Sequence, residues 1–220
     1  MRVVAIDGPA GAGKSTVARL VAVATGLPFL DTGAMYRCVA LRCLREGIAA
    51  GESSAVADVA GRVSIEVRDG ATMLDGEDVS ADIRTPEVNA VVSIIAANSA
   101  VRDVMREAQR RWAQNVGGGV VEGRDIGTVV FPDASLKVFL TASPEVRARR
   151  RVAESGGDVE EVSRSIAERD RLDSNRSDSP LRPAPGSVTV DSSDRSVDDV
   201  VAEIVGLLER QEAGTDDVRR

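Results

Sequence analysis

A glycine-rich segment near the amino terminus carries the clearest chemical signal in the chain. Residues 8–16 read Gly-Pro-Ala-Gly-Ala-Gly-Lys-Ser-Thr and match the phosphate-loop pattern G-x-x-x-x-G-K-[ST]. Glycines let backbone N–H groups turn toward a bound phosphate, and the helix after such a loop points its positive end at the same anion. We therefore predict that Lys14 binds the β- and γ-phosphates of a nucleotide and that the Ser15 hydroxyl binds Mg²⁺. The residues predicted to bind the nucleotide are Gly8, Pro9, Ala10, Gly11, Ala12, Gly13, Lys14, Ser15 and Thr16.

A charged turn follows the apolar residues 120–121. Glu122, Arg124 and Asp125 stand there in the order Glu-Gly-Arg-Asp. An acid at a strand end beside a phosphate loop can hold a water on Mg²⁺, so Glu122 is a candidate metal-binding residue. Arg124, two residues later, could hold the phosphate of a second substrate. The competing interpretation is a turn that only links the strand to the next loop.

A second polar segment, residues 31–37, follows the short apolar pair at 29–30 and opens a helix. It reads Asp-Thr-Gly-Ala-Met-Tyr-Arg. One interpretation is a helix N-terminus that Thr32 caps. The other places Arg37 on a second anionic ligand, and the spacing alone favours neither.

Arginines are concentrated between residues 147 and 182. Arg147, Arg150 and Arg151 share one helix face, because successive helical residues are about 100° apart. A solvated surface is the ordinary interpretation of such a face. Phosphoryl transfer, however, needs cations that close over the transferring group and exclude water, so we predict an arginine-rich lid. The arginines of this part include Arg147, Arg149, Arg150, Arg151, Arg169, Arg171, Arg176 and Arg182.

The elements around these segments alternate between strand and helix. Alternation of this kind predicts an α/β fold, with a parallel sheet and helices on both of its faces. In such sheets ligands lie beyond the carboxyl ends of the strands, which is where the candidate segments stand. The predicted strands cover residues 2–7, 29–31, 120–122, 136–140 and 188–190, and the predicted helices 14–25, 34–46, 86–97, 100–115 and 196–211, with further helices opened by Ser143-Pro144 and by Asp158.

Residues 62–80 have a different pattern. Val63, Ile65 and Val67 alternate with polar residues, and Asp69-Gly70 is a hairpin turn signal. We therefore predict a small antiparallel insertion between helices.

Composition excludes several functional classes. The 220 residues contain no His, which excludes Ser-His-Asp catalysis and His-ligated metal sites. A net charge of −7, with one Trp, one Tyr and three Phe, argues against nucleic acid as a partner. We find no signal peptide and no apolar run of roughly 18 residues, so we expect a soluble cytoplasmic protein without a membrane partner. Cys38 and Cys43 are expected to be reduced and partly buried.

The ordered set of motifs resembles bacterial cytidylate kinase, a family of nucleoside-monophosphate kinases. The resemblance runs from about Val3 to about Leu208, and its most specific part is the stretch 122–134. It implies transfer of a phosphoryl group from ATP to CMP or dCMP, with Mg²⁺, by a cytoplasmic monomer. The motifs are G-P-A-G-A-G-K-S-T, L-D-T-G-A-M-Y-R, D-I-R-T, E-G-R-D-I-G-T-V-V-F-P-D-A, R-A-R-R-R and E-R-D-R-x-D-x-N-R.

The resemblance also implies roles for residues that would bind the acceptor. Arg37 and Arg124 match positions that grip the acceptor phosphate. Ser93, Arg102 and Asp125 match positions that read cytosine. An alternative for Asp125 is a purely structural role, in which it pairs with Arg124 or caps the turn.

Further residues belong to the same implied site. Thr32 stands where many relatives carry Ser and keeps the hydroxyl, and Tyr36 lies in the same motif. Asp173 matches a position near the sugar and phosphates. The residues predicted to act in catalysis are Lys14, Arg124, Arg150, Arg169 and Arg176, although the arginine of 147–151 that meets the transferring phosphate is not fixed by the sequence.

The resemblance divides the single predicted domain, residues 1–220, into three parts and a tail. These are a core of about residues 1–35, 117–145 and 186–211, an acceptor-binding part of about 36–116, a lid of about 147–176, and a disordered tail from Glu212.

Two alternative functions come from other classes. A GTPase switch would need a guanine-reading N-K-x-D motif, and the two lysines of the chain, Lys14 and Lys137, do not stand in one. A kinase for another small acceptor, such as shikimate, gluconate or another nucleotide, remains open because the phosphate loop does not name the acceptor.

Overall fold

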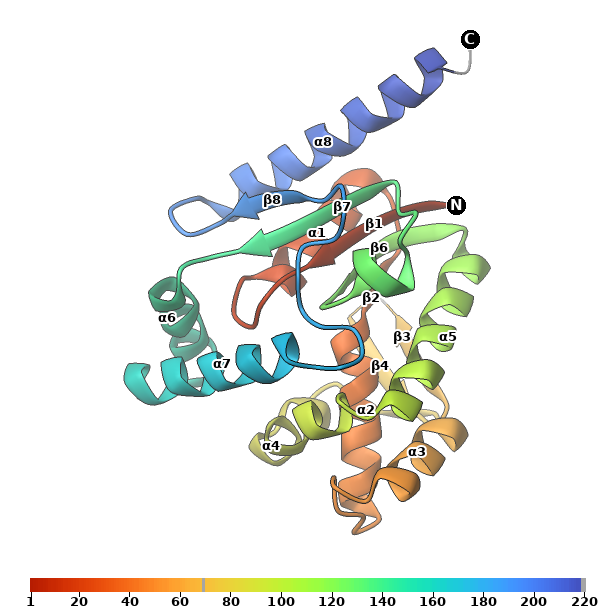
Figure 1. The fold of residues 1–220 in the computed structure, drawn as a ribbon, viewed down its shortest axis with the longest axis vertical. Helices are drawn as coiled ribbons and strands as arrows, with labels where there is room; N and C mark the ends of the chain where they lie inside the picture. Colours follow the sequence, from red (N-terminus) through yellow and green to blue (C-terminus); the bar gives the residue numbers. More distant parts are fainter. Residues whose placement is uncertain (69, 219–220) are drawn as a thin grey trace. The chain divides into compact units, whose positions relative to one another are not determined.

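Five strands form a sheet that belongs to the first of two structural units, except that its residues Leu30 and Asp31 are counted with the second (Figure 1). The computed structural model describes residues 1–68 and 70–218. The first unit comprises Met1–Phe29 and the chain from Ala113 onward, and the second comprises Leu30–Trp112. The strand order is β2-β6-β1-β7-β8, and the pairs β1–β6, β1–β7 and β7–β8 are parallel. The strands are β1 (Arg2–Asp7), β2 (Phe29–Asp31), β6 (Gly118–Gly123), β7 (Leu136–Thr141) and β8 (Val188–Asp191).

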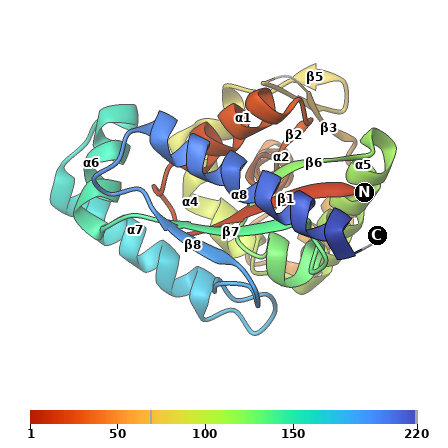
Figure 2. The same cartoon turned by 90° about the horizontal axis from the view of Figure 1, so that it is seen from above.

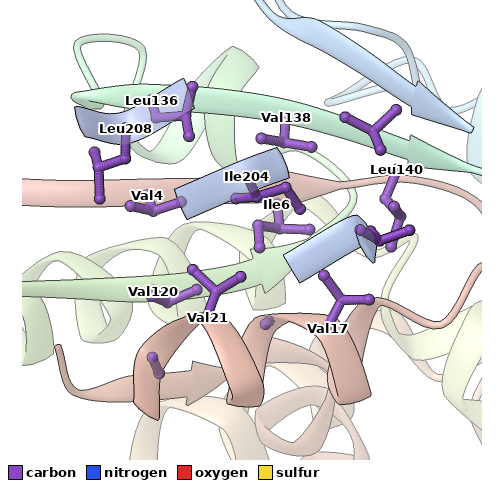
Figure 3. Close-up of a cluster of buried hydrophobic side chains, with 14 residues drawn as sticks. Val4, Ile6, Val17, Val21, Val120, Leu136, Val138, Leu140, Ile204 and Leu208 are labelled. Carbon is purple, nitrogen blue, oxygen red and sulfur yellow. The ribbon is translucent and has the colours of Figure 1, made fainter. Parts of the chain in front are cut away.

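Two helices, α1 (Lys14–Thr25) and α8 (Val197–Val218), pack with this sheet to form the hydrophobic core. Figure 2 shows α8 lying across the strands, and Figure 3 shows the side chains that meet between them. Alternate residues of β1 and residues one turn apart on α1 reach the same cluster, as strand and helix periodicity requires. The labelled members are Val4, Ile6, Val17, Val21, Val120, Leu136, Val138, Leu140, Ile204 and Leu208.

Strand β6 begins two residues earlier than predicted, within the glycine run 117–119. Gly118 pairs with Arg2 of β1 and has a φ of 131°. A Cβ atom at Gly118 would lie 2.1 Å from the carbonyl oxygen of Arg2, so only glycine allows the two strands to come this close. The glycine run is therefore part of the sheet rather than only a break before it.

The remaining elements of the first unit are η2 (Ile126–Val130), a short π-helical turn, and the helices α6 (Pro144–Ser155) and α7 (Val159–Ser174). Both helices begin where predicted. The Ser143 side chain accepts a hydrogen bond from Val146 N, and the Asp158 side chain accepts from Glu160 N and Glu161 N. The η2 turn was not predicted.

The second unit contains helices around a small antiparallel sheet of order β3-β4-β5, which confirms the predicted insertion. Gly70 has a φ of 89°, but Asp69, the other residue of the predicted hairpin turn, lies outside the described residues. Helix α3 was not predicted. The elements are α2 (Thr32–Arg45), α3 (Ser53–Arg62), β3 (Ile65–Arg68), β4 (Ala71–Leu74), β5 (Glu77–Asp78), η1 (Asp82–Arg84), α4 (Pro86–Ile95) and α5 (Ser99–Val116), whose last residues belong to the first unit.

One interpretation and one expectation about helix ends are wrong. Asp31, not Thr32, caps α2, because its Oδ1 accepts from Ala34 N at 3.0 Å and the helix already begins at Thr32. The tail predicted to be disordered from Glu212 is instead helical through Val218. The Glu212 carboxylate pairs with Arg2 at the start of β1, a contact between the two ends of the chain that no local pattern predicts. The last two residues of that predicted tail, 219–220, lie outside the described part.

Both cysteines lie in α2 and are buried free thiols, as expected. Burial, followed by the negative charges of Asp31 and Asp75, raises the pKa of Cys38 to about 12. Within residues 1–68 and 70–218, no single helix is long and apolar enough to cross a membrane, although α4 and α5 together, bent by 99°, would be.

Candidate active site

The phosphate loop, residues 8–13, joins the end of β1 to the start of α1, as the sequence predicts. A Cβ atom on Gly8 would lie 2.0 Å from the carbonyl oxygen of Leu140 in β7, so the first position requires glycine. Gly13 has a φ of 86° and directly precedes α1. Ser15 and Thr16 follow in the first turn of the helix and are exposed. Their hydroxyls are therefore accessible to a ligand.

Lys14 is buried at the start of α1, and its amino group donates to the carbonyl oxygen of Pro9 at 2.8 Å. Burial, and then mainly the positive charge of Arg124 with a smaller effect of Arg169, lowers the pKa of Lys14 to about 7, against the opposing effect of two nearby carboxylates. The structure therefore groups three of the predicted catalytic cations within electrostatic reach of one another. A bound polyphosphate would neutralise this repulsion.

The two carboxylates are those of Glu122 and Asp7. Glu122 was predicted to be a site residue, and Asp7 was not. Both are buried, at the ends of the neighbouring parallel strands β6 and β1. Among the residues that the structure describes, no group of three His, Cys, Asp or Glu side chains could hold a metal ion.

Asp7 holds the turn that carries Arg124 and Asp125. Its two carboxylate oxygens accept hydrogen bonds from Ile126 N at 2.8 Å and Gly127 N at 2.7 Å. Burial raises the pKa of Asp7 to about 6, although these two backbone hydrogen bonds lower it. A signal did exist in the sequence, because an acid follows the apolar residues 3–6 directly before the phosphate loop.

Asp173 of α7 joins two of the predicted arginines. Its buried carboxylate accepts from Arg124 Nε at 2.9 Å and also pairs with Arg176. Burial alone would raise the pKa of this carboxyl, but Arg124, Arg176 and Arg169 together hold it below its ordinary value. Asp173 thus fixes the direction of guanidinium groups that are predicted to bind phosphate.

Asp125 is also buried. Its side chain makes no capping hydrogen bond to the η2 turn. The base-reading role and the structural role of Asp125 both stay predictions.

Two arginines of the predicted lid contact the phosphate loop itself. Arg147 donates to the carbonyl oxygen of Ala10 at 3.0 Å. Arg150 donates to the carbonyl oxygen of Ala12 at 3.4 Å and to Ser192 Oγ at 2.9 Å. These two residues therefore do not lie on a purely solvated helix face, whereas Arg149 on the same helix is exposed.

The second unit holds the other predicted substrate residues. Arg37 of α2 donates to Ile83 O at 2.9 Å and to Asn89 Oδ1 at 2.7 Å. Arg102 of α5 is only 1% exposed, donates to Ala96 O at 3.0 Å, and places its guanidinium carbon 5.6 Å from the centre of the Tyr36 ring. Thr32 is buried in the first turn of α2, and Ser93 is half-buried on α4.

Comparison with known proteins gives a consistent result. The family model for cytidylate kinase matches residues 4–210. The chain is similar to the cytidylate kinase of Desulforamulus reducens, with 49% identity over 94% of this chain and 96% of that protein. It is also similar to the cytidylate kinase of Rhodococcus opacus, with 46% identity over 92% of this chain and 93% of that protein.

Solved structures at low identity support the fold alone. A gluconokinase from Sinorhizobium meliloti has a TM-score of 0.52 at 18% identity and covers 100% of this chain and 98% of its own. A shikimate kinase from Bacteroides thetaiotaomicron has a TM-score of 0.50 at 15% identity and covers 94% and 98%. The predicted phosphate-loop kinase fold is therefore confirmed.

Proposed function

Because this chain belongs to the cytidylate kinase family, we propose that it transfers the γ-phosphoryl group of ATP to the phosphate of CMP, forming ADP and CDP. We propose dCMP as an equivalent acceptor that yields dCDP. The observation that carries the proposal is the grouping of Lys14, Arg124 and Arg169 beside a phosphate loop. Little covalent chemistry is required of the protein in phosphoryl transfer, so positioned cations account for most of the catalysis.

Lys14 would change partners when the nucleotide binds. Its amino group donates to the Pro9 carbonyl oxygen. Phosphate oxygens are stronger acceptors for an ammonium group than a neutral carbonyl, since the hydrogen bond is then charge-assisted on both sides. The Lys14 charge would therefore lie on the β- and γ-phosphates, where negative charge accumulates during transfer.

The acceptor phosphate needs cations whose direction is fixed in advance. Arg124 and Arg176 are both bonded to the buried Asp173 carboxylate. We expect Arg124 to bind the acceptor phosphate and Arg169 and Arg176 to bind the transferring group. Arg150 was also predicted to bind the transferring group. Because it contacts the backbone of the phosphate loop, we propose that it supports the loop instead.

Mg²⁺ fits the residues present. The exposed Ser15 hydroxyl stands in the first turn after the loop, and the buried Glu122 carboxylate lies within electrostatic reach of Lys14. We propose that these two side chains hold the ion, Ser15 directly and Glu122 through water. Bound Mg²⁺ neutralises charge on the β- and γ-phosphates.

The remaining assignments follow from the family resemblance and stay proposals. We expect Asp125, Arg102 and Ser93 to read cytosine, and Arg37, Thr32 and Tyr36 to contact the nucleotide acceptor. We also propose a core, an acceptor-binding part and a lid of about residues 147–176. The working form is proposed to be a cytoplasmic monomer without a nucleic-acid or membrane partner.

One coupled assay of ADP release tests the function. The acceptors are CMP, dCMP, UMP, AMP, shikimate and gluconate, each with ATP and Mg²⁺. We expect CMP and dCMP to give the highest kcat/KM. Preferred turnover of a non-nucleotide acceptor would overturn the proposal.

The variant Lys14→Ala tests the phosphate loop in the same assay. It should lose at least ~10²–10³ in kcat, because a preorganised charge on the transferring phosphate contributes ~3–4 kcal/mol. The melting temperature of the variant should change little, because it loses the contacts of Lys14 but also the cost of burying a cation. A folded variant with unchanged turnover would contradict the phosphate-loop assignment.

A further inference from the structure

Side chains bind the outward-facing carbonyl groups of the phosphate loop, a role that the sequence did not indicate. A loop that turns its N–H groups toward a phosphate must turn its carbonyl groups the other way, and buried carbonyls need donors. Three of these carbonyls have one. Pro9 O accepts from Lys14 Nζ, Ala10 O accepts from Arg147 and Ala12 O accepts from Arg150.

Ala10 is held on both sides by one ion pair. Asp170 of α7 accepts from Ala10 N at 3.0 Å, while Arg147 of α6 donates to Ala10 O at 3.0 Å. Arg147 and Asp170 also pair directly with each other. The two side chains are only 11% and 19% exposed, so solvent screens the pair far less than an ion pair on the surface.

The packing beside this pair leaves the loop little freedom. A Cβ atom on Gly11 would lie 3.1 Å from both Arg147 Cβ and Arg147 O, so α6 presses directly on the residue after Ala10. The peptide before Ala10 is bound at both ends as well, because its oxygen accepts from Lys14 and its N–H donates to Asp170. A shift of Asp170 would therefore move the backbone acceptor that orients the Lys14 amino group.

We propose that Arg147 and Asp170 are positioning residues for ATP: they fix the Ala10 backbone so that the loop and Lys14 are preorganised for the nucleotide phosphates. Neither residue needs to touch the transferring group. Preorganisation of this kind strengthens ligand binding because the loop is already ordered before the ligand arrives. The proposal rests on the proposed function only in requiring that the loop binds ATP.

The test measures ATP affinity by calorimetric titration without any acceptor, together with kcat and the KM values for ATP and CMP. Asp170→Ala should raise the Kd for ATP roughly ten- to a hundredfold, the range for one lost charge-assisted hydrogen bond. The KM for CMP should change by less than about threefold. Asp170→Asn should be the milder variant, because an amide oxygen can still accept from Ala10 N.

The matched control is Glu168→Ala, which removes an exposed carboxylate of the same helix that pairs with Arg171. It should leave the ATP affinity unchanged. The double variant Arg147→Ala with Asp170→Ala should cost clearly less than the sum of the single variants, because both act through the same backbone segment.

Three outcomes would overturn the proposal. One is an unchanged Kd for ATP in folded Asp170→Ala. Another is a larger loss for CMP than for ATP, which would place Asp170 in the acceptor subsite. The third is strict additivity in the double variant. Wild-type protein that binds ATP but does not phosphorylate CMP would contradict the proposed function while leaving this inference standing.

Discussion

Single carboxylates orient the cations of the candidate site. Asp173 holds Arg124 and Arg176, Asp7 holds the turn that follows Arg124, and Asp170 holds the loop next to Lys14. An arginine directed by a buried acid keeps its fork geometry before the phosphate arrives, so less side-chain entropy is lost on binding. Carboxylates with this role can be identified only from the structure, because the fold brings them to their partners.

Asp125 gives a test of base selection. An ionised carboxylate only accepts hydrogen bonds, so it would attract the C4 amino group of cytosine and repel the C4 oxygen of uracil. We predict that Asp125→Ala lowers kcat/KM for CMP by ~1–3 kcal/mol and collapses the CMP-to-UMP ratio. Steady-state kinetics with both nucleotides checks this. A preserved ratio, with both activities and the melting temperature lowered together, would show that Asp125 is structural.

Asp7 gives a pH-dependent test. Its pKa is raised from 3.8 to about 6, so between these values the unfolded chain has lost a proton that the folded protein still holds. The Asp7 contribution to stability is therefore largest at low pH and falls as pH rises toward 6, by ~3 kcal/mol in total.

The variant Asp7→Asn cannot titrate. Relative to wild type, its free energy of unfolding should therefore increase by roughly 2.5 kcal/mol between pH 4 and pH 7, measured by urea denaturation at each pH. A difference that shrinks as pH rises would mean that the pKa of Asp7 is lowered in the folded protein.

The elements differ in how far the sequence predicts them. Strand β1 and helix α1 have the bounds that the apolar run and Gly26 indicate, and Gly26 ends the helix in the left-handed conformation. The η2 turn was missed because it spans only five residues, and the two backbone bonds to Asp7 that hold it come from β1. Helix α3 was missed although Val56, Val59 and Ala60 have helical spacing, because it is short and contains Gly61 in its last turn.

The same distinction applies to the candidate site. The phosphate loop could be predicted because its chemistry depends on consecutive residues. The contacts of Asp7, Asp170 and Ser192 with distant backbone atoms could not, because they depend on how helices and strands pack.

Helices α6 and α7 carry a prediction at the element scale. We expect residues 147–176 to act as a lid, so amide hydrogen exchange there should slow when ATP and CMP analogues are both bound. Because Arg147 and Asp170 already bond to the loop, we expect the largest change away from these two residues. Helix α8, part of the sheet core, is the internal control. Equal protection with and without both ligands would argue for a static surface.

At the scale of the whole molecule, the two units divide the predicted substrate residues between them. Arg124 belongs to the first unit and Arg37 to the second. We predict that Arg37→Ala and Arg124→Ala each weaken CMP use by ~1.5–3 kcal/mol, as for a lost charge-assisted hydrogen bond, with ATP affinity nearly unchanged.

Arg45→Ala is the control for these variants, because Arg45 lies on the same helix as Arg37 and pairs with the exposed carboxylates of Glu77 and Asp82. Kinetics at varied CMP and ATP separate the two substrates. An equal loss for both nucleotides would show that the arginines were assigned to the wrong subsite.

The burial of both cysteines has a practical consequence for labelling the molecule. Thiol-directed reagents attack the exposed thiolate form, and Cys38 is buried with its pKa raised to about 12, while Cys43 is buried with its pKa also raised. The native chain should therefore stay unmodified, as mass spectrometry can verify. A cysteine placed at the exposed Ser54 of α3 or Ser165 of α7 would then be the only reactive thiol, so each unit can carry a dye at one chosen site without removal of a natural residue.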